Sequence, residues 1–136
     1  YAGPYELAAK SLYRENIIFT GFVPGDELPV LFKACDIFAF PTLYEGFGLP
    51  PLEAMACGVS VVASNVSSLP EVVGDAALTV NPRDSGEIAA AISKLLTDGV
   101  LRAEMSRRGL ERAKKFSWNS TAAEMIKVYK KVCPEK

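Results

Sequence analysis

The sequence predicts an α/β fold in which a doubly wound parallel sheet has helices on both faces. Short apolar runs, typical of buried strands, recur along the chain at 17–20, 37–40, 59–63 and 77–80. The segments between them have apolar residues at helical spacing, and glycine, proline, asparagine or aspartate separates the two kinds of segment. Because strands that alternate with helices are typical of parallel sheets, these observations together predict the fold class.

The first strand is expected between two helices. One helix is predicted over 5–15, and a second from Asp26, which we expect to cap it, through Cys35. A third, short helix follows the second strand. Pro51 suits its first position, where the missing N–H costs nothing, and Gly58 suits its end.

The third strand is expected to lead through a polar loop into a single helical turn over 69–74. Ser67 or Ser68 is the expected cap of this turn. After the fourth strand, Asp84 and Glu87 have the spacing of a capping box at the start of another helix.

The last two predicted helices differ in character. The helix over 100–115 is rich in arginine and lysine. We interpret its charge as a solvated face rather than a nucleic-acid patch, because no aromatic residues lie among the charges. Ser117 is expected to cap the final helix, whose apolar stripe from Trp118 to Val132 is interpreted as core or as an interface.

Composition narrows the possible functions. The chain has 136 residues, 49% of them hydrophobic, which fits one domain with a core. A net charge of −1 gives no overall field that would recruit nucleic acid or an anionic membrane. Histidine is absent, which excludes His-based catalysis and His-ligated metal within these residues. We expect Cys35, Cys57 and Cys133 to be free thiols, the first two buried, and the start at Tyr1 to reflect a longer protein.

The stretch from Tyr44 to Gly58 is the candidate site. Gly46 and Gly48 allow positive φ and bring backbone N–H groups close to a ligand, and a helix start follows, so the stretch predicts an anion site suited to phosphate. Glu45 and Glu53 flank it, and carboxylates beside an anion site suggest contacts to hydroxyl groups. The alternatives are a solvated loop acid for Glu45 and, for Glu53, a first-turn carboxylate that complements the helix dipole.

Three loops are expected to border one crevice. Ligands of such sheets bind outside the carboxyl ends of the strands. The loops at those ends are 20–23, 42–48 and 64–68.

With these segments in order, the sequence resembles the group-1 (family 4) retaining glycosyltransferases of the GT-B fold. Residues 45–53 are similar to the E-x7-E motif of that family. The flanking segments that match are Gly21-Phe22-Val23-Pro24, Asp36-Ile37-Phe38-Ala39-Phe40-Pro41-Thr42, Glu53-Ala54-Met55-Ala56-Cys57-Gly58, Leu69-Pro70-Glu71-Val72-Val73-Gly74 and Phe116-Ser117-Trp118.

The resemblance implies a Rossmann-like fold in which residues 1–136 are the C-terminal, nucleotide-sugar-binding domain of a GT-B protein, shortened at its N-terminal side. Glu45 is then the catalytic residue, at the hydroxyls of the transferred sugar. Glu53 would bind the ribose, and Val23 the base. The N–H groups of the loop would lie at the sugar and diphosphate. These N–H groups belong to Phe47, Gly48 and Leu49, and Gly46 is a further donor-binding residue.

The resemblance also implies a reaction. A sugar would pass from a nucleotide-sugar co-substrate, GDP-mannose or a UDP-sugar, to a glycan or lipid-linked acceptor held by an N-terminal domain absent here, with no metal or other cofactor. Many members of the family have Gly-Gly at the position of Ser67-Ser68. The Ser-Ser pair resembles the variant in mannosyltransferases that use GDP-mannose. The expected location is the cytoplasm, with the full-length protein peripheral at the inner face of the membrane. These residues alone are expected to bind donor weakly and to transfer nothing.

Two alternatives stay open: a nucleotide- or sugar-binding module without catalysis, and a sugar-nucleotide epimerase of the GT-B fold. A structural expectation accompanies the resemblance. If the strand order is 3-2-1-4-5-6, the strands that separate 17–20 from 37–40 are missing. We therefore expect these two strands either to pair directly or to expose edges that a second copy of the chain covers.

Overall fold

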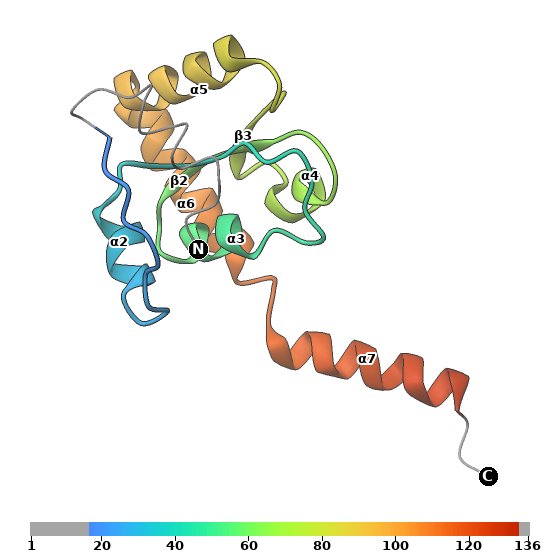
Figure 1. Ribbon diagram of the computed structural model, residues 1–136. Helices are drawn as coiled ribbons and strands as arrows, with labels where there is room; N and C mark the ends of the chain where they lie inside the picture. The colour runs from blue at the N-terminus through green and yellow to red at the C-terminus, as the bar shows by residue number, and fades with distance from the viewer. Residues whose placement is uncertain (1–16, 134–136) are drawn as a thin grey trace.

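The computed structural model describes residues 17–133, and it confirms the predicted α/β fold (Figure 1). A parallel three-stranded sheet is formed by β1 (Ile37–Phe40), β2 (Ser60–Ser64) and β3 (Ala77–Val80), in that spatial order. Phe38 lies opposite Val61, and Val62 lies opposite Leu78. The helix predicted over 5–15 lies outside the described residues.

Helices cover both faces of the sheet, which makes it doubly wound (Figure 1). The helices of the described chain are α2 (Leu28–Ala34), α3 (Leu49–Ala56), α4 (Leu69–Val73), α5 (Ser85–Thr97), α6 (Gly99–Ala113) and α7 (Trp118–Val132). Successive β2 side chains point to opposite faces. Val61 joins the core with α2, α3 and α4, while Val62 joins a second cluster with α5 and α6.

The strand predicted over 17–20 is wrong. These residues form no strand, and Ile18 is 85% exposed. Within the described chain β1 pairs only with β2, so the predicted direct pairing with 17–20 is wrong as well. A strand is stable only if a neighbour takes up its backbone hydrogen bonds. In the expected strand order, 17–20 is not adjacent to 37–40. Its apolar sequence alone was therefore not enough to form a strand.

The helix caps were predicted in part. Asp84 accepts hydrogen bonds from the N–H groups of Gly86 and Glu87, as expected. The Glu87 carboxylate, however, accepts from the N–H of Asn81, so the capping box is incomplete. The cap predicted for Asp26 is wrong, because α2 begins after Glu27 and has no side-chain cap. Ser117 caps α7 through the N–H of Ser120, as predicted.

The cysteines are free thiols, as predicted, but they are less buried than expected. Cys35 and Cys133 are exposed and Cys57 is partly buried. Cys35 lies one residue beyond the end of α2, at the C-cap, rather than on the helix face that packs on the core.

The final helix, α7, extends away from the rest of the molecule (Figure 1). None of its residues is buried, and Trp118 and Val132 are 76% and 72% exposed. The interpretation of its stripe as core is therefore wrong for residues 17–133, among which no helix or strand packs closely against α7. The interpretation as an interface stays a prediction. Within residues 17–133, no helix has the length and apolarity needed to span a membrane.

Candidate functional site

Two of the three predicted loops meet at the carboxyl edge of the sheet. The Glu45 loop, residues 41–48, joins β1 to α3, and the loop at 65–68 joins β2 to α4. Where the loops leave the sheet, the buried Ser64 hydroxyl donates to the carbonyl oxygen of Thr42 at 2.5 Å. Figure 1 shows the Glu45 loop passing beside α4.

The Glu45 loop is bonded to two consecutive serines. The Ser67 hydroxyl donates to the carbonyl oxygen of Glu45 at 2.6 Å and accepts from the N–H of Glu45 at 3.3 Å. The Ser68 hydroxyl lies 2.9 Å from the same carbonyl oxygen and 2.7 Å from that of Phe47. The expectation that one of these serines caps α4 is wrong, because Ser68, at the cap position, makes no side-chain cap hydrogen bond.

The helix after the loop begins earlier than predicted. Its first residue is Leu49, with Gly48 at the N-cap in a left-handed conformation (φ 111°). Pro50 and Pro51 follow in the first turn and bring no N–H group. The loop amides therefore contribute more to the predicted anion site than the helix start does. In the described chain, the N–H groups of residues 46–49 have no hydrogen-bond partner.

Both candidate carboxylates are unpaired. Glu45 is partly buried and Glu53 is exposed, and within residues 17–133 neither carboxylate makes a hydrogen bond or an ion pair. Glu53 is the fifth residue of α3, and the first turn of that helix holds no acid. Because the dipole effect is confined to the first turn, the alternative role of Glu53 as a dipole partner is not supported.

The ring of Phe47 packs against an aromatic residue from the segment after α6. The rings of Phe47 and Phe116 meet edge to face, with centroids 5.8 Å apart. The Arg112 guanidinium lies 5.2 Å from the centroid of Phe116, and it donates to the carbonyl oxygens of Val72, at 2.9 Å, and Glu71. The segment after α6 thus supports the Glu45 loop. Phe116 belongs to the segment Phe116-Ser117-Trp118 that matches the family, but the sequence did not indicate its contact with Phe47.

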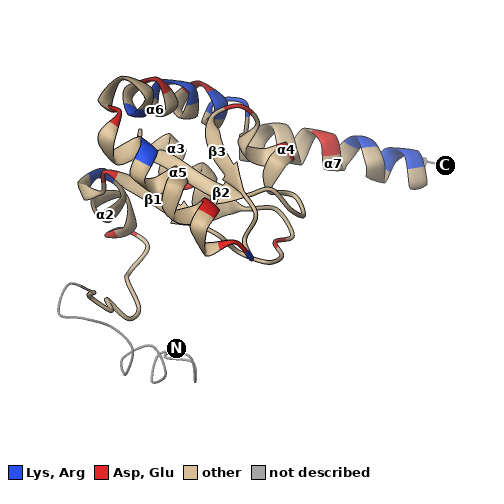
Figure 2. Cartoon of the chain, turned by 90° about the horizontal axis from the view of Figure 1, so that it is seen from above, with Lys and Arg blue, Asp and Glu red and all other residues tan. Residues whose placement is uncertain are grey.

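Val23 is not brought to this group. It is partly buried beside α2, whereas the Glu45 loop lies by α4, and both views of the chain place α2 and α4 far apart (Figures 1 and 2). Two of the three loops expected to border one crevice are therefore in contact at the carboxyl edge, and the loop at 20–23 does not join them. Residues 17–20, which precede that loop, form no strand. The crevice itself stays a prediction.

Sequence reasoning did not single out a role for Thr42. Its hydroxyl oxygen is buried and, among the described residues, is the one buried side-chain polar atom without a hydrogen-bond partner. No group of three or more acidic, histidine or cysteine side chains that could hold a metal occurs within 17–133.

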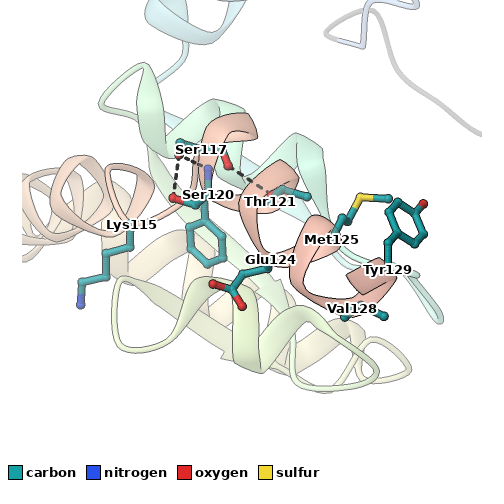
Figure 3. Close-up of a pocket in the computed structure, with 9 residues that line it drawn as sticks. Lys115, Ser117, Ser120, Thr121, Glu124, Met125, Val128 and Tyr129 are labelled. Carbon is teal, nitrogen blue, oxygen red and sulfur yellow. Dashed lines mark hydrogen bonds between the residues drawn. The ribbon is translucent and has the colours of Figure 1, made fainter. Parts of the chain in front are cut away.

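A groove lies beside the segment after α6, whose Phe116 also contacts Phe47 of the Glu45 loop. It has a volume of about 550 Å³ and lies along the start of α7, where Phe116, Met125, Val128 and Tyr129 form its apolar wall (Figure 3). Many Lys and Arg residues also lie along α6 and α7 (Figure 2). Several of these cations pair with acids of their own helix, as Arg107 and Arg108 do with Glu104.

The parallel sheet, together with the solved structures that match it, places this chain in the GT-B class. Residues 3–112 match the family described as glycosyl transferases group 1, and the chain belongs to this family. It is 51% identical over 126 residues to O-antigen chain mannosyltransferase B of Escherichia coli. It is 38% identical over 134 residues to the MMP alpha-(1->4)-mannosyltransferase of Mycolicibacterium hassiacum.

Those matches cover 93% and 95% of this chain but only 33% of each relative, so the chain spans about a third of their length. Solved structures agree. Sucrose-phosphate synthase from Thermosynechococcus elongatus matches with a TM-score of 0.82 and 30% identity, over 94% of this chain and 33% of that one. HepE of Anabaena, solved in complex with UDP and glucose, matches with a TM-score of 0.77 and 28% identity, over 91% and 35%.

Proposed function

We propose that this chain is the C-terminal, donor-binding part of a retaining glycosyltransferase. The observation that supports this most directly is the Glu45 loop, where four free N–H groups lie between two unpaired carboxylates. A nucleotide-sugar has the matching chemistry, because its diphosphate accepts hydrogen bonds while its sugar and ribose offer hydroxyls. The Anabaena structure with UDP and glucose agrees with a donor of this kind.

Each group of the loop has a role in the proposed reaction. Glu45 accepts hydrogen bonds from hydroxyls of the transferred sugar, and Glu53 accepts them from the ribose. The N–H groups of residues 46–49 donate to the diphosphate as the bond to the sugar breaks and negative charge builds up there. Donors held in place before the reaction stabilise that charge without having to reorganise.

The donor we propose first is GDP-mannose, with a UDP-sugar as the alternative. Relatives at 51% and 38% identity are named as mannosyltransferases, and the E. coli relative is named for the O-antigen chain. We therefore propose a glycan or lipid-linked acceptor, bound by an N-terminal domain outside these residues. The protein would act in the cytoplasm, at the inner face of the membrane.

A donor panel tests this proposal. The full-length transferase that carries this chain is incubated with GDP-, UDP- and ADP-sugars and a mannan-type acceptor, and the anomeric configuration of the product is read by NMR. We expect transfer from GDP-mannose with retained configuration. Nucleotide binding without transfer from any donor would instead favour the non-catalytic module, and inversion at C2 of the donor sugar would favour the epimerase.

We expect substitutions of the two carboxylates to change different kinetic parameters. Glu53→Gln weakens hydrogen bonds to the ribose and should raise the KM for donor. Glu45→Gln acts at the reacting sugar and should mainly lower kcat. A hydrogen bond to a charged group contributes about 1.5–3 kcal/mol, so each change should be on the order of 10- to 100-fold. Glu27→Gln, an exposed acid before α2, is the matched control, and wild-type kinetics in both site variants would refute the assignment.

Metal independence is a further part of the proposal. The N–H groups of residues 46–49 would take the place of a cation at the diphosphate, so we expect transfer to continue in excess EDTA. Loss of transfer in EDTA, restored by added Mg²⁺ or Mn²⁺, would overturn this part. The chain alone is expected to bind donor weakly and to transfer nothing.

A further inference from the structure

The pair Ser67 and Ser68, here called the serine clamp, holds the main chain of the Glu45 loop. We propose that the clamp is a positioning device for the donor: it orients two peptide planes so that the N–H groups of Gly46 and Gly48 face the diphosphate. This inference rests on the proposed function for its ligand, while the clamp itself is defined by contacts within the chain.

The clamp bonds to alternate carbonyl groups. The Ser67 hydroxyl donates to the carbonyl oxygen of Glu45 at 2.6 Å, and the Ser68 hydroxyl shares its single proton between that oxygen, at 2.9 Å, and the carbonyl oxygen of Phe47, at 2.7 Å. Ser67 also accepts from the N–H of Glu45 at 3.3 Å, which fixes the residue at both main-chain polar groups. A loop with no ladder of its own is thereby tied to the start of α4.

Peptide geometry relates these hydrogen bonds to the direction of the neighbouring N–H groups. The described chain has no cis peptide bond, and in a planar trans peptide the N–H and C=O groups point in opposite directions. The carbonyl of Glu45 shares its peptide plane with the N–H of Gly46, and the carbonyl of Phe47 shares its plane with the N–H of Gly48. Since both carbonyls point at the Ser68 hydroxyl, both N–H groups point away from it.

The backbone of Ser67 indicates that its hydroxyl matters. Ser67 is the one non-glycine residue of the described chain with positive φ, at 58°. That conformation is uncommon for a residue with a Cβ and persists where surrounding contacts impose it. Here the contacts are the two hydrogen bonds to Glu45. A glycine at this position would adopt the same φ without strain but could not make these bonds.

The next residue extends the same contact. Leu69 packs against Gly48 so closely that a Cβ added there would lie 2.5 Å from the Leu69 Cδ2 atom. Three consecutive residues, 67–69, thus contact the loop from Glu45 to Gly48. Helix capping does not account for the serines, because α4 has no side-chain cap.

The experiment uses Ser67→Gly, Ser68→Ala and the double variant. Each is made in the 136-residue chain and in the full-length transferase. In the chain, backbone order parameters from NMR are expected to fall at residues 46–48, from about 0.85 toward 0.6 or lower. In the transferase, kcat with GDP-mannose should fall on the order of 10- to 100-fold, with a smaller change in KM, because misplaced donors weaken the transition state most.

Matched variants separate positioning from stability. Ser67→Gly should unfold no more easily than Ser67→Ala, which keeps the positive φ and also loses the hydroxyl, yet both should lose kcat. Ser68→Thr keeps a hydroxyl and should restore most of the activity lost in Ser68→Ala, and Ser93→Ala on the exposed side of α5 serves as a neutral control.

The outcomes are distinct. Wild-type order parameters in the double variant would overturn the clamp, as would a loss of kcat no larger than the loss of folded protein. If the wild-type transferase transfers no sugar from any donor, the proposed function fails, and the order parameters alone then decide whether the clamp orients the loop.

Discussion

At the scale of single residues, the shape of the Glu45 loop depends on Gly48 and on the two serines opposite it. Gly48 has φ 111° and lies against Leu69, so the position requires a residue without a Cβ. Ser67 also has positive φ but is held by hydrogen bonds. Backbone conformation at these positions therefore decides where the free amides and Glu45 lie.

We expect Gly48→Ala to destabilise the protein. The new Cβ would lie 2.5 Å from Leu69 in a backbone conformation that alanine rarely adopts, which costs about 1–3 kcal/mol for strain alone. The measurement is the free energy of unfolding in urea. Gly46→Ala is the control for stability, because a Cβ there meets nothing within 4 Å, and equal stability of the two variants would contradict the left-handed backbone at Gly48.

At Thr42, in contrast to Gly48, we expect a substitution to leave stability unchanged or to raise it. Its buried hydroxyl has no partner in the described chain, and an unsatisfied buried polar group costs about 1–3 kcal/mol. We expect Thr42→Val, which keeps the shape and removes the hydroxyl, to leave the free energy of unfolding unchanged or to raise it. A loss of stability of more than about 1 kcal/mol would show that the hydroxyl does have a partner in solution.

Sequence reasoning at this scale singled out the two glutamates and Gly48, which has positive φ, but Gly46 does not have the positive φ that the sequence suggested, and the serines were assigned to a helix cap. The reason is chemical. A serine hydroxyl before a helix can bond either to the helix N–H groups or to a neighbouring loop, and both uses are local patterns of the same residue type. Only the approach of the Glu45 loop, 22 residues earlier in the chain, decides between them.

At the scale of elements, the strand predictions are confirmed where the sheet supplies a partner strand. The runs at 37–40 and 77–80 are strands with the predicted limits, and the third strand is displaced by one residue to Ser60–Ser64. The run at 17–20 is also mostly apolar but has no neighbouring strand in the described chain. Apolar β-branched sequence therefore predicts a strand only where another backbone can pair with it.

Helix α6 gives a prediction for acid conditions. Hydrogen bonds from Arg107 and Arg108 lower the pKa of Glu104 to about 2, from an ordinary value of 4.5. Because the folded-state pKa is the lower one, this contact stabilises the protein above pH 4.5, and its contribution is lost as the pH falls from 4.5 toward 2. An NMR titration of the carboxyl carbon should show this pKa directly.

Arg107→Gln should raise the pKa of Glu104 toward its ordinary value, because the hydrogen bond from Arg107 is the largest cause of the shift. Lys127→Gln, on the separate Glu124 pair of α7, is the matched control and should leave Glu104 unchanged. A Glu104 pKa near 4.5 in the wild-type protein would contradict this arrangement. The pair is partly exposed, so its effect on unfolding should also weaken with added salt.

At the scale of the whole molecule, two features are exposed that proteins usually cover. Within the described chain β1 has a strand on one side only, and α7 presents Trp118, Tyr129 and Val132 to solvent. Open edges and apolar faces promote association. The expectation that a second copy covers such an edge stays a prediction. Because 17–20 forms no strand, it now concerns the edge of β1 alone.

We predict that the chain self-associates as its concentration rises, and that Ala39→Lys, on the exposed position of β1, reduces the association. Sedimentation velocity over a range of concentrations measures both effects. Sedimentation as a monomer throughout the range would contradict this prediction.

The central claim is that the Glu45 loop binds a nucleotide-sugar. The most direct test is an NMR titration of the 136-residue chain with GDP-mannose, with GDP and mannose as separate probes. We predict saturable shifts at the amides of residues 46–49, with a Kd on the order of 1 mM, weakened by Glu53→Gln and not by Glu27→Gln. Absence of saturable shifts at these amides, or saturation confined to other elements, would contradict the account.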